Sequence, residues 1–408
     1  MKQFRKHIEW ILILFGIFLN FFGREISSYL GQTFFGLPNY RLIPINKFYE
    51  ESIFEMEIVY AIILTGVLTL FFVSRKATEP ENKIYNTNNQ FNFFLKAIII
   101  GFLLIFFSEI NWSFNVSDRG VDQFQRNLGG ALGRLKLLFF PVFAYYLVVS
   151  QKKSKILIIS IFIVIGLFTV STAGRREIMY LFIIIILYYY GQGEMSAQKL
   201  KKMRLVFPLI IGVAFLSNML RSGKEIEGVN FGMFVAASSI LGGIGTNAIL
   251  WQVKEFVAYK TGLLFGLTFW TYVKIIFVPS FLLFALQGNE YVARGAFLFN
   301  EHYNTSENMG YDFMMIADFY WNFGYIGYVL FIVVILGIIY LVKRWKSSRK
   351  PALRALSLLI VMYLIVGQRS DFGFFLKNVF YNAIVLIFLD SARRVKLISQ
   401  KQTSNTVN

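Results

Sequence analysis

Residues 326–366 read IGYVLFIVVILGIIYLV-KRWKSSRKPALRA-LSLLIVMYLIV, two apolar runs separated by a short and strongly basic segment. The runs Ile326–Val342 and Leu356–Val366 contain no Asp, Glu, Lys, Arg or His, whereas residues 343–354 hold six Lys and Arg and no acid. Apolar runs of this kind predict membrane-spanning helices, and basic loops between such helices stay on the cytoplasmic side. The stretch therefore predicts a helical hairpin whose loop faces the cytoplasm.

The same pattern recurs along the whole chain. Ten apolar runs can be recognised: Ile8–Phe22, Ile58–Val73, Phe93–Ile110, Leu135–Val149, Ile156–Val170, Ile178–Tyr190, Leu205–Leu220, Ile326–Val342, Leu356–Val366 and Phe374–Leu389. The N-terminus and every second loop together hold 23 Lys and Arg against five acids, whereas the other loops hold 17 basic and 18 acidic residues. The net charge of +18 therefore lies on one side, as the positive-inside rule requires. We expect an all-α, polytopic membrane protein, a single integral membrane domain over residues 1–408 with ten crossings and both termini in the cytoplasm.

The longest loop, residues 221–325, is predicted on the outer side and is not simply polar. It contains the apolar segments Phe231–Trp251 and Leu263–Leu286, the second of which is interrupted by Lys274 and Pro279. These segments could form one more hairpin, which would give twelve crossings. We favour partial or interfacial helices that cover an outer cavity, because a lysine and a proline are poorly placed in the middle of a bilayer.

Composition excludes several classes of function. The mean hydropathy of +0.56 exceeds that of soluble chains, and the basic excess is explained by topology, so we expect no nucleic-acid partner. The chain has no cysteine and only two histidines, and it has no paired-carboxylate motif, so we expect no metal. No P-loop or dinucleotide fingerprint occurs, and the short inner loops leave no room for a nucleotide-binding domain. We expect no cofactor.

Five arginines are predicted at the outer ends of helices, where they could form an anion site. They are Arg175, Arg176, Arg221, Arg294 and Arg369. Guanidinium groups bind phosphate oxygens in a bidentate manner, and a pyrophosphate offers two phosphate groups to bind. The alternative is that each arginine reaches lipid headgroups or pairs with a nearby acid such as Glu177.

Residues for proton transfer and sugar binding are also predicted on the outer side. His302, outside the N-terminal tail the only histidine, and Asp318 are the candidate catalytic bases, and Asp318 would need burial to raise its pKa. Asp312, Tyr320 and Trp321 could line a sugar site, because rings stack on sugars and carboxylates accept from hydroxyls. The alternatives are a solvent-exposed, idle histidine and a belt of aromatic residues at the membrane interface.

Four short segments of the chain carry a family resemblance that covers roughly residues 160–390. They are Thr172–Arg176 (TAGRR), Ile275–Pro279 (IIFVP), the run from Gly310 to Gly327 with ADFYWNFG, and Gly367–Asp371 (GQRSD). Together they resemble the oligosaccharide repeat-unit polymerases of bacterial surface polysaccharides, the Wzy or O-antigen polymerase type. Members often have Glu at the position of Asp318 and Pro-Arg at that of Pro279-Ser280, so this chain departs from the pattern there.

The resemblance implies a membrane glycosyltransferase of the bacterial cytoplasmic (inner) membrane. Such an enzyme transfers a growing glycan from undecaprenyl pyrophosphate to the next lipid-linked repeat unit on the outer face, for O-antigen, capsule or exopolysaccharide. The arginines would then stabilise the departing pyrophosphate, and one base would take the proton of the acceptor hydroxyl. Partners would be the lipid-linked oligosaccharide, membrane lipids, a chain-length regulator and a flippase. An O-antigen ligase and, less favoured, a lipid-linked oligosaccharide flippase are the alternatives.

Overall fold

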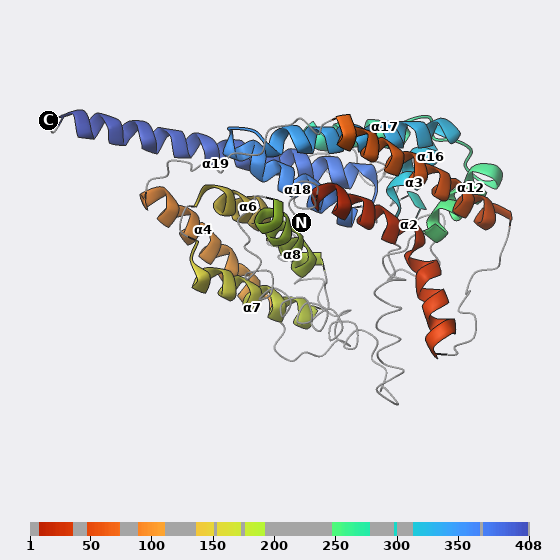
Figure 1. Ribbon diagram of the computed structural model, residues 1–408, viewed down its shortest axis with the longest axis horizontal. Coiled ribbons are helices and arrows are strands. Elements are labelled where there is room, and N and C mark those ends of the chain that lie inside the picture. The colour runs from red at the N-terminus through yellow and green to blue at the C-terminus, as the bar shows by residue number, and fades with distance from the viewer. Residues whose placement is uncertain are drawn as a thin grey trace.

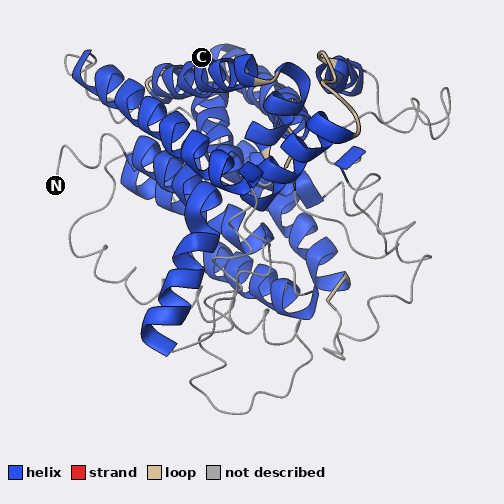
Figure 2. Cartoon of the chain, turned by 90° about the vertical axis from the view of Figure 1, so that its right-hand side faces the viewer, coloured by secondary structure: helices blue, strands red, loops and turns tan. Residues whose placement is uncertain are grey.

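The computed structural model describes residues 8–35, 47–73, 89–110, 136–150, 153–172, 176–191, 247–277, 298–299, 313–367 and 370–406. Throughout these ranges the regular structure is α-helical, and no strand occurs in them (Figure 2). The helices are α2 (Ile8–Phe35), α3 (Lys47–Val73), α4 (Asn89–Ser108), α6 (Phe139–Val149), α7 (Lys155–Thr172), α8 (Arg176–Gly191), α12 (Asn247–Tyr259), α13 (Leu267–Phe277), α16 (Met315–Phe323), α17 (Tyr325–Lys346), α18 (Pro351–Gly367) and α19 (Phe372–Thr406). The predicted all-α class is confirmed for this part of the chain.

Nine of the ten apolar runs coincide with helices, and the tenth, Leu205–Leu220, lies outside the described residues. Four helices are long and apolar enough to cross a membrane, in the stretches Glu50–Leu70, Asn89–Ser108, Tyr325–Lys346 and Phe372–Val395. Five further apolar helices are shorter. The structure thus agrees with a polytopic membrane protein, while ten crossings stay a prediction.

The two helices that fall within the predicted outer loop are short. Helix α12 has 13 residues and α13 has 11, whereas about 20 residues are needed to cross the apolar core of a bilayer. Helix α12 begins and α13 ends at the border of the described residues, so partial helices over residues 221–325 stay a prediction. Of residues 221–325, the structure describes 247–277, 298–299 and 313–325.

Helix α18 lies at the centre of the bundle. It packs against α2, α6, α8, α17 and α19, and almost every side chain from Ala355 to Leu364 is buried. Helices α4, α6, α7 and α8 form a group on one side of it, while α3, α17 and α19 run along the other side (Figure 1). An apolar helix buried on all sides, as α18 is, is typical of the interior of a membrane bundle.

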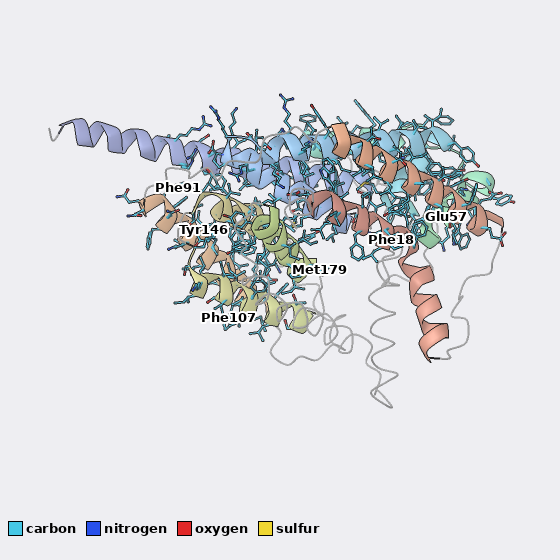
Figure 3. All side chains as sticks on the ribbon, in the orientation of Figure 1. Phe18, Glu57, Phe91, Phe107, Tyr146 and Met179 are labelled. Carbon is cyan, nitrogen blue, oxygen red and sulfur yellow. The ribbon has the colours of Figure 1, made fainter. Side chains whose placement is uncertain are left out.

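Peripheral helices bury one face and expose a second face that is equally apolar. In α4 the buried residues recur every three or four positions: Phe91, Leu95, Ile99, Leu103 and Phe106. Phe93 and Leu104 of the same helix are 74% and 65% exposed, and Phe107 is also exposed (Figure 3). Large exposed apolar faces would be unstable in water but are stable against lipid tails, which supports a membrane location.

Charged residues separate to the two ends of the bundle. At the end of α17, Lys346 Nζ lies 2.6 Å from Glu9 Oε1 at the start of α2, and the basic Arg393 lies in the C-terminal part of α19. At the opposite end, the starts of α3, α17 and α19 meet α12, α13 and α16 (Figure 1). The Lys346–Glu9 contact joins two segments that the charge pattern places on the same, cytoplasmic side. The assignment of the second end to the outside stays a prediction.

Candidate functional site

The candidate site is built at the end of the bundle where α12, α13 and α16 pack against the longer helices. Helix α16 is separated from α17 by Gly324, whose φ of +59° is a conformation that L side chains rarely adopt. This break turns the chain, so that the buried residues of α16 face α12 and α13 while α17 continues along α3. Two polar clusters result, and they have different surroundings.

The first is the Asp318 cluster, formed by Asp318, Asn322, Thr268, Tyr272 and Asp371. Asp318 is fully buried. Its Oδ2 accepts hydrogen bonds from the Tyr272 hydroxyl at 2.6 Å and from the backbone N–H of Phe372 at 3.1 Å. Its Oδ1 accepts from the Thr268 hydroxyl at 3.0 Å. One carboxylate therefore joins α13, α16 and the first residue of α19.

Asn322, one turn after Asp318, completes the connection between α13 and α16. Its Nδ2 donates to Thr268 Oγ1 at 2.6 Å and to Asp318 Oδ1 at 3.3 Å, and its Oδ1 accepts from the Thr268 N–H at 3.3 Å. Buried polar groups are costly unless each finds a partner, and these groups supply one another. The cluster is thus closed and its hydrogen bonds are satisfied internally.

Close packing of α19 on α13 depends on a glycine. A Cβ atom at Gly373 would overlap the ring of Tyr272, so that only glycine lets the two helices approach this closely. The approach places the Tyr272 hydroxyl and the Phe372 N–H on the same carboxylate oxygen of Asp318. The absence of a side chain at Gly373 is therefore required for the hydrogen bonds of the Asp318 cluster.

Asp371 is the second buried acid of this cluster. It caps α19, since its Oδ1 accepts the Phe374 N–H at 2.7 Å. Helix α16 is not among the helices long enough to span a membrane. Burial of Asp318 and the negative charge of Asp371 raise the pKa of Asp318 to about 7. Hydrogen bonds from Tyr272, Phe372 and Thr268 oppose that rise. Asp318 is therefore buried and has a raised pKa, while its role as a base stays a prediction.

The second is the Lys254 cluster, formed by Lys254 of α12, Glu51 and Glu55 of α3, Tyr320 of α16, and Tyr325 and Tyr328 of α17. Lys254 Nζ lies 2.6 Å from Glu55 Oε2 and 4.0 Å from Glu51 Oε2. The Tyr328 hydroxyl donates to Glu55 Oε2 at 2.5 Å. One cation therefore faces two carboxylates at the outer ends predicted for α3 and α17.

Three tyrosine rings cover this ion pair. Tyr320 and Tyr328 stack with centroids 5.4 Å apart, and Tyr325 meets them edge-on at 5.7 and 6.1 Å. Lys254 Nζ lies 5.6 Å from the ring centre of Tyr320, within the range of a cation–π contact. Rings and charges therefore share one site between α3, α12, α16 and α17.

The sequence-predicted residues are distributed unequally over these clusters. Asp318 lies in the first and Tyr320 in the second. Trp321 is fully buried: its Nε1 donates to Thr261 Oγ1 at 3.0 Å, and its ring packs against Phe256 and Phe313, so it presents no ring face for a sugar. The remaining predicted residues lie outside the described residues: His302, Asp312, Arg175, Arg221, Arg294 and Arg369. Arg176 begins α8, but its side chain is not described.

Sequence reasoning missed Lys254, Glu51 and Glu55. The sequence predicts an apolar run only from Ile58 onward, whereas α3 already begins at Lys47. The sequence did contain a signal for a shared site: Glu51 and Glu55 precede an apolar run and are four residues apart, so they lie on one face of a helix. Within the described ranges, no group of three or more His, Asp or Glu residues could hold a metal ion.

Comparisons with known proteins identify the family. Residues 1–396 match the family described as O-antigen polysaccharide polymerase Wzy. No curated protein and no solved structure matches the chain. Because the match spans almost the entire sequence, including every helix that builds the two clusters, the chain belongs to the Wzy family of O-antigen polysaccharide polymerases.

Proposed function

We propose that this protein joins undecaprenyl-pyrophosphate-linked oligosaccharide repeat units into a surface polysaccharide on the outer face of the bacterial cytoplasmic membrane. The observation that carries the proposal is the family match over residues 1–396. The all-helical bundle with lipid-compatible outer faces supports it, because a membrane-embedded enzyme can receive a lipid-linked substrate directly.

The proposed step transfers a glycosyl group. A hydroxyl oxygen of the acceptor repeat unit forms a bond to the anomeric carbon of the donor glycan. The bond between that carbon and the phosphate oxygen breaks, and the lipid leaves as undecaprenyl pyrophosphate. The hydroxyl proton passes to a base. Because the donor is already activated, neither ATP nor a nucleotide sugar is required.

Arginines are the proposed partners of the leaving pyrophosphate. Arg175, Arg176, Arg221, Arg294 and Arg369 all belong to segments predicted on the outer side, and guanidinium forks stabilise charge that develops on phosphate oxygens. Arg369 lies only three residues before Phe372 in the sequence, and the Phe372 N–H is bound to Asp318. The Asp318 cluster would therefore fix the backbone next to one proposed pyrophosphate ligand.

His302 and Asp318 are the proposed bases. Four donors already occupy the oxygens of Asp318, so an acceptor hydroxyl has to replace one of them before this carboxylate can take a proton. While those donors stay in place, Asp318 acts as a positioning residue for α13 and α19. His302 has the more suitable ordinary pKa for a base at neutral pH.

Purified protein supplied with lipid-linked repeat units tests the proposal. We expect a ladder of glycans that differ by one repeat unit and remain on the lipid, and a loss of this ladder with Arg369→Lys, because an ammonium group cannot form the bidentate contact. Transfer of glycan to a different lipid acceptor, without a ladder, would instead identify a ligase. Movement of intact lipid-linked units across vesicles without a new glycosidic bond would identify a flippase.

A further inference from the structure

The Lys254 cluster has a buried side and an exposed side. Lys254 and Tyr328 are 3% and 7% exposed, whereas Tyr325 is 63% exposed and the side chain of Glu51 is 38% exposed. Tyr325 is the first residue of α17, and Glu51 lies near the start of α3. Tyr325 and Glu51 are therefore the members of the cluster that the described residues leave most uncovered.

The charge of the cluster determines which solute it fits. One lysine and two glutamates leave a net charge of −1, and Lys254 is already paired with Glu55. A phosphate or pyrophosphate would be repelled there, in contrast to a site built from arginines. Carboxylates that accept hydrogen bonds and a ring that offers an apolar face suit a neutral, hydroxyl-rich molecule instead.

A purely structural role explains only the buried half of the cluster. The Lys254–Glu55 pair holds α12 against α3, and the Tyr328 hydroxyl adds α17 to that contact. This role does not require an aromatic ring at Tyr325 or a second carboxylate 4.0 Å from Lys254 at Glu51.

We propose that the Lys254 cluster binds a sugar of the acceptor repeat unit, with the Tyr325 ring stacked on the sugar and Glu51 and Glu55 accepting from its hydroxyls. Tyr320 and Lys254 position these groups. The inference rests on the proposed polymerase function and names the subsite for one of its two substrates.

Charge also explains why the acceptor, and not the donor, binds here. The reacting sugar of the donor is bonded directly to pyrophosphate, whose negative charges a cluster of net charge −1 would repel. The reacting sugar of the acceptor lies at the nonreducing end, separated from its own pyrophosphate by the length of the repeat unit. An aromatic subsite with a net charge of −1 is therefore compatible with the uncharged acceptor end only.

Equilibrium binding of the host's repeat-unit oligosaccharide, released from its lipid carrier by mild acid, tests this subsite on the full-length protein in detergent. We expect Tyr325→Ala and Glu51→Gln each to weaken binding about tenfold, because each removes one direct contact worth about 1.4 kcal/mol. Tyr325→Phe should bind within about threefold of wild type, because the stacking face is retained.

The matched control is Tyr340→Ala, which removes a tyrosine that is 53% exposed near the other end of the same helix. It should bind as wild type does, and all variants should elute as the same folded species. Wild-type binding by Tyr325→Ala, equal loss in Tyr340→Ala, or no binding of the oligosaccharide by the wild-type protein would overturn the subsite. If wild-type protein forms no ladder yet binds the oligosaccharide in a Tyr325-dependent manner, the polymerase proposal fails and the sugar subsite stands.

Discussion

The two polar clusters at one end of the bundle use similar residues in different ways. Each combines two carboxylates with at least one tyrosine, and α16 contributes to both. The oxygens of Asp318 are fully enclosed and bound by four donors, whereas Tyr325 and Glu51 leave the Lys254 cluster partly exposed. Enclosure favours a role in holding helices, and exposure favours a role in binding. Substitutions that affect one cluster and not the other can separate these roles.

The largest effect is expected from Asp318→Leu. The change leaves the Tyr272 and Thr268 hydroxyls and the Phe372 N–H buried without an acceptor, at a cost of about 1–3 kcal/mol each. We expect most of the protein to be lost as aggregate when size-exclusion profiles are compared. Asp318→Asn keeps one acceptor oxygen and should retain a folded fraction. A Leu variant as stable as wild type would contradict the positioning role.

An intermediate effect is expected from Lys254→Met. The change leaves the mostly buried Glu55 without its cation, which should lower the free energy of unfolding by about 3 kcal/mol. Thermal unfolding in detergent measures it. Lys260→Met, an exposed lysine of the same region, is the control and should stay within about 0.5 kcal/mol of wild type. Adding Glu55→Gln to Lys254→Met should recover stability, because it removes the unpaired charge and keeps an acceptor for the Tyr328 hydroxyl, and no recovery would show that the pair is not the cause.

The smallest effect is a pH dependence of stability, which we expect from the Asp318 cluster and not from the Lys254 cluster. Because the pKa of Asp318 is raised to about 7, the folded protein binds a proton that the unfolded chain has released above about pH 4. Stability should therefore fall as pH rises through 7, by about 1 kcal/mol between pH 6 and 8. Unfolding midpoints of wild type and Asp318→Asn should diverge over this range. Parallel curves would show that Asp318 is not the titrating group.

The fold was largely predictable because the membrane imposes a simple rule. Apolar runs must form helices whose backbone groups are satisfied internally, and nine of the ten predicted runs are helices. The same reasoning placed the start of α3 too late, at Ile58 instead of Lys47. Residues 47–55 hold four charged residues, which interrupt the apolar pattern although they belong to the same helix.

The site was predictable only in part. Asp318 was selected from an acid beside aromatic residues, and the structure places it in a buried cluster. The same pattern also selected Trp321, whose ring is enclosed by Phe256 and Phe313, because composition does not reveal which way α16 faces. The contact between Lys254 and Glu55 joins residues about 200 positions apart, so local patterns could not indicate it.

Transfer on the outer face requires that both clusters lie on the side opposite the basic loops. Because the chain has no native cysteine, single cysteines can report this directly. Tyr259 at the end of α12 is 73% exposed, and Ser347 follows α17 within the basic segment. In intact spheroplasts, Tyr259→Cys should react with a membrane-impermeant maleimide, and Ser347→Cys should react only after permeabilisation. A Tyr259→Cys protein that reacts only after permeabilisation would place the clusters in the cytoplasm and contradict polymerisation on the outer face.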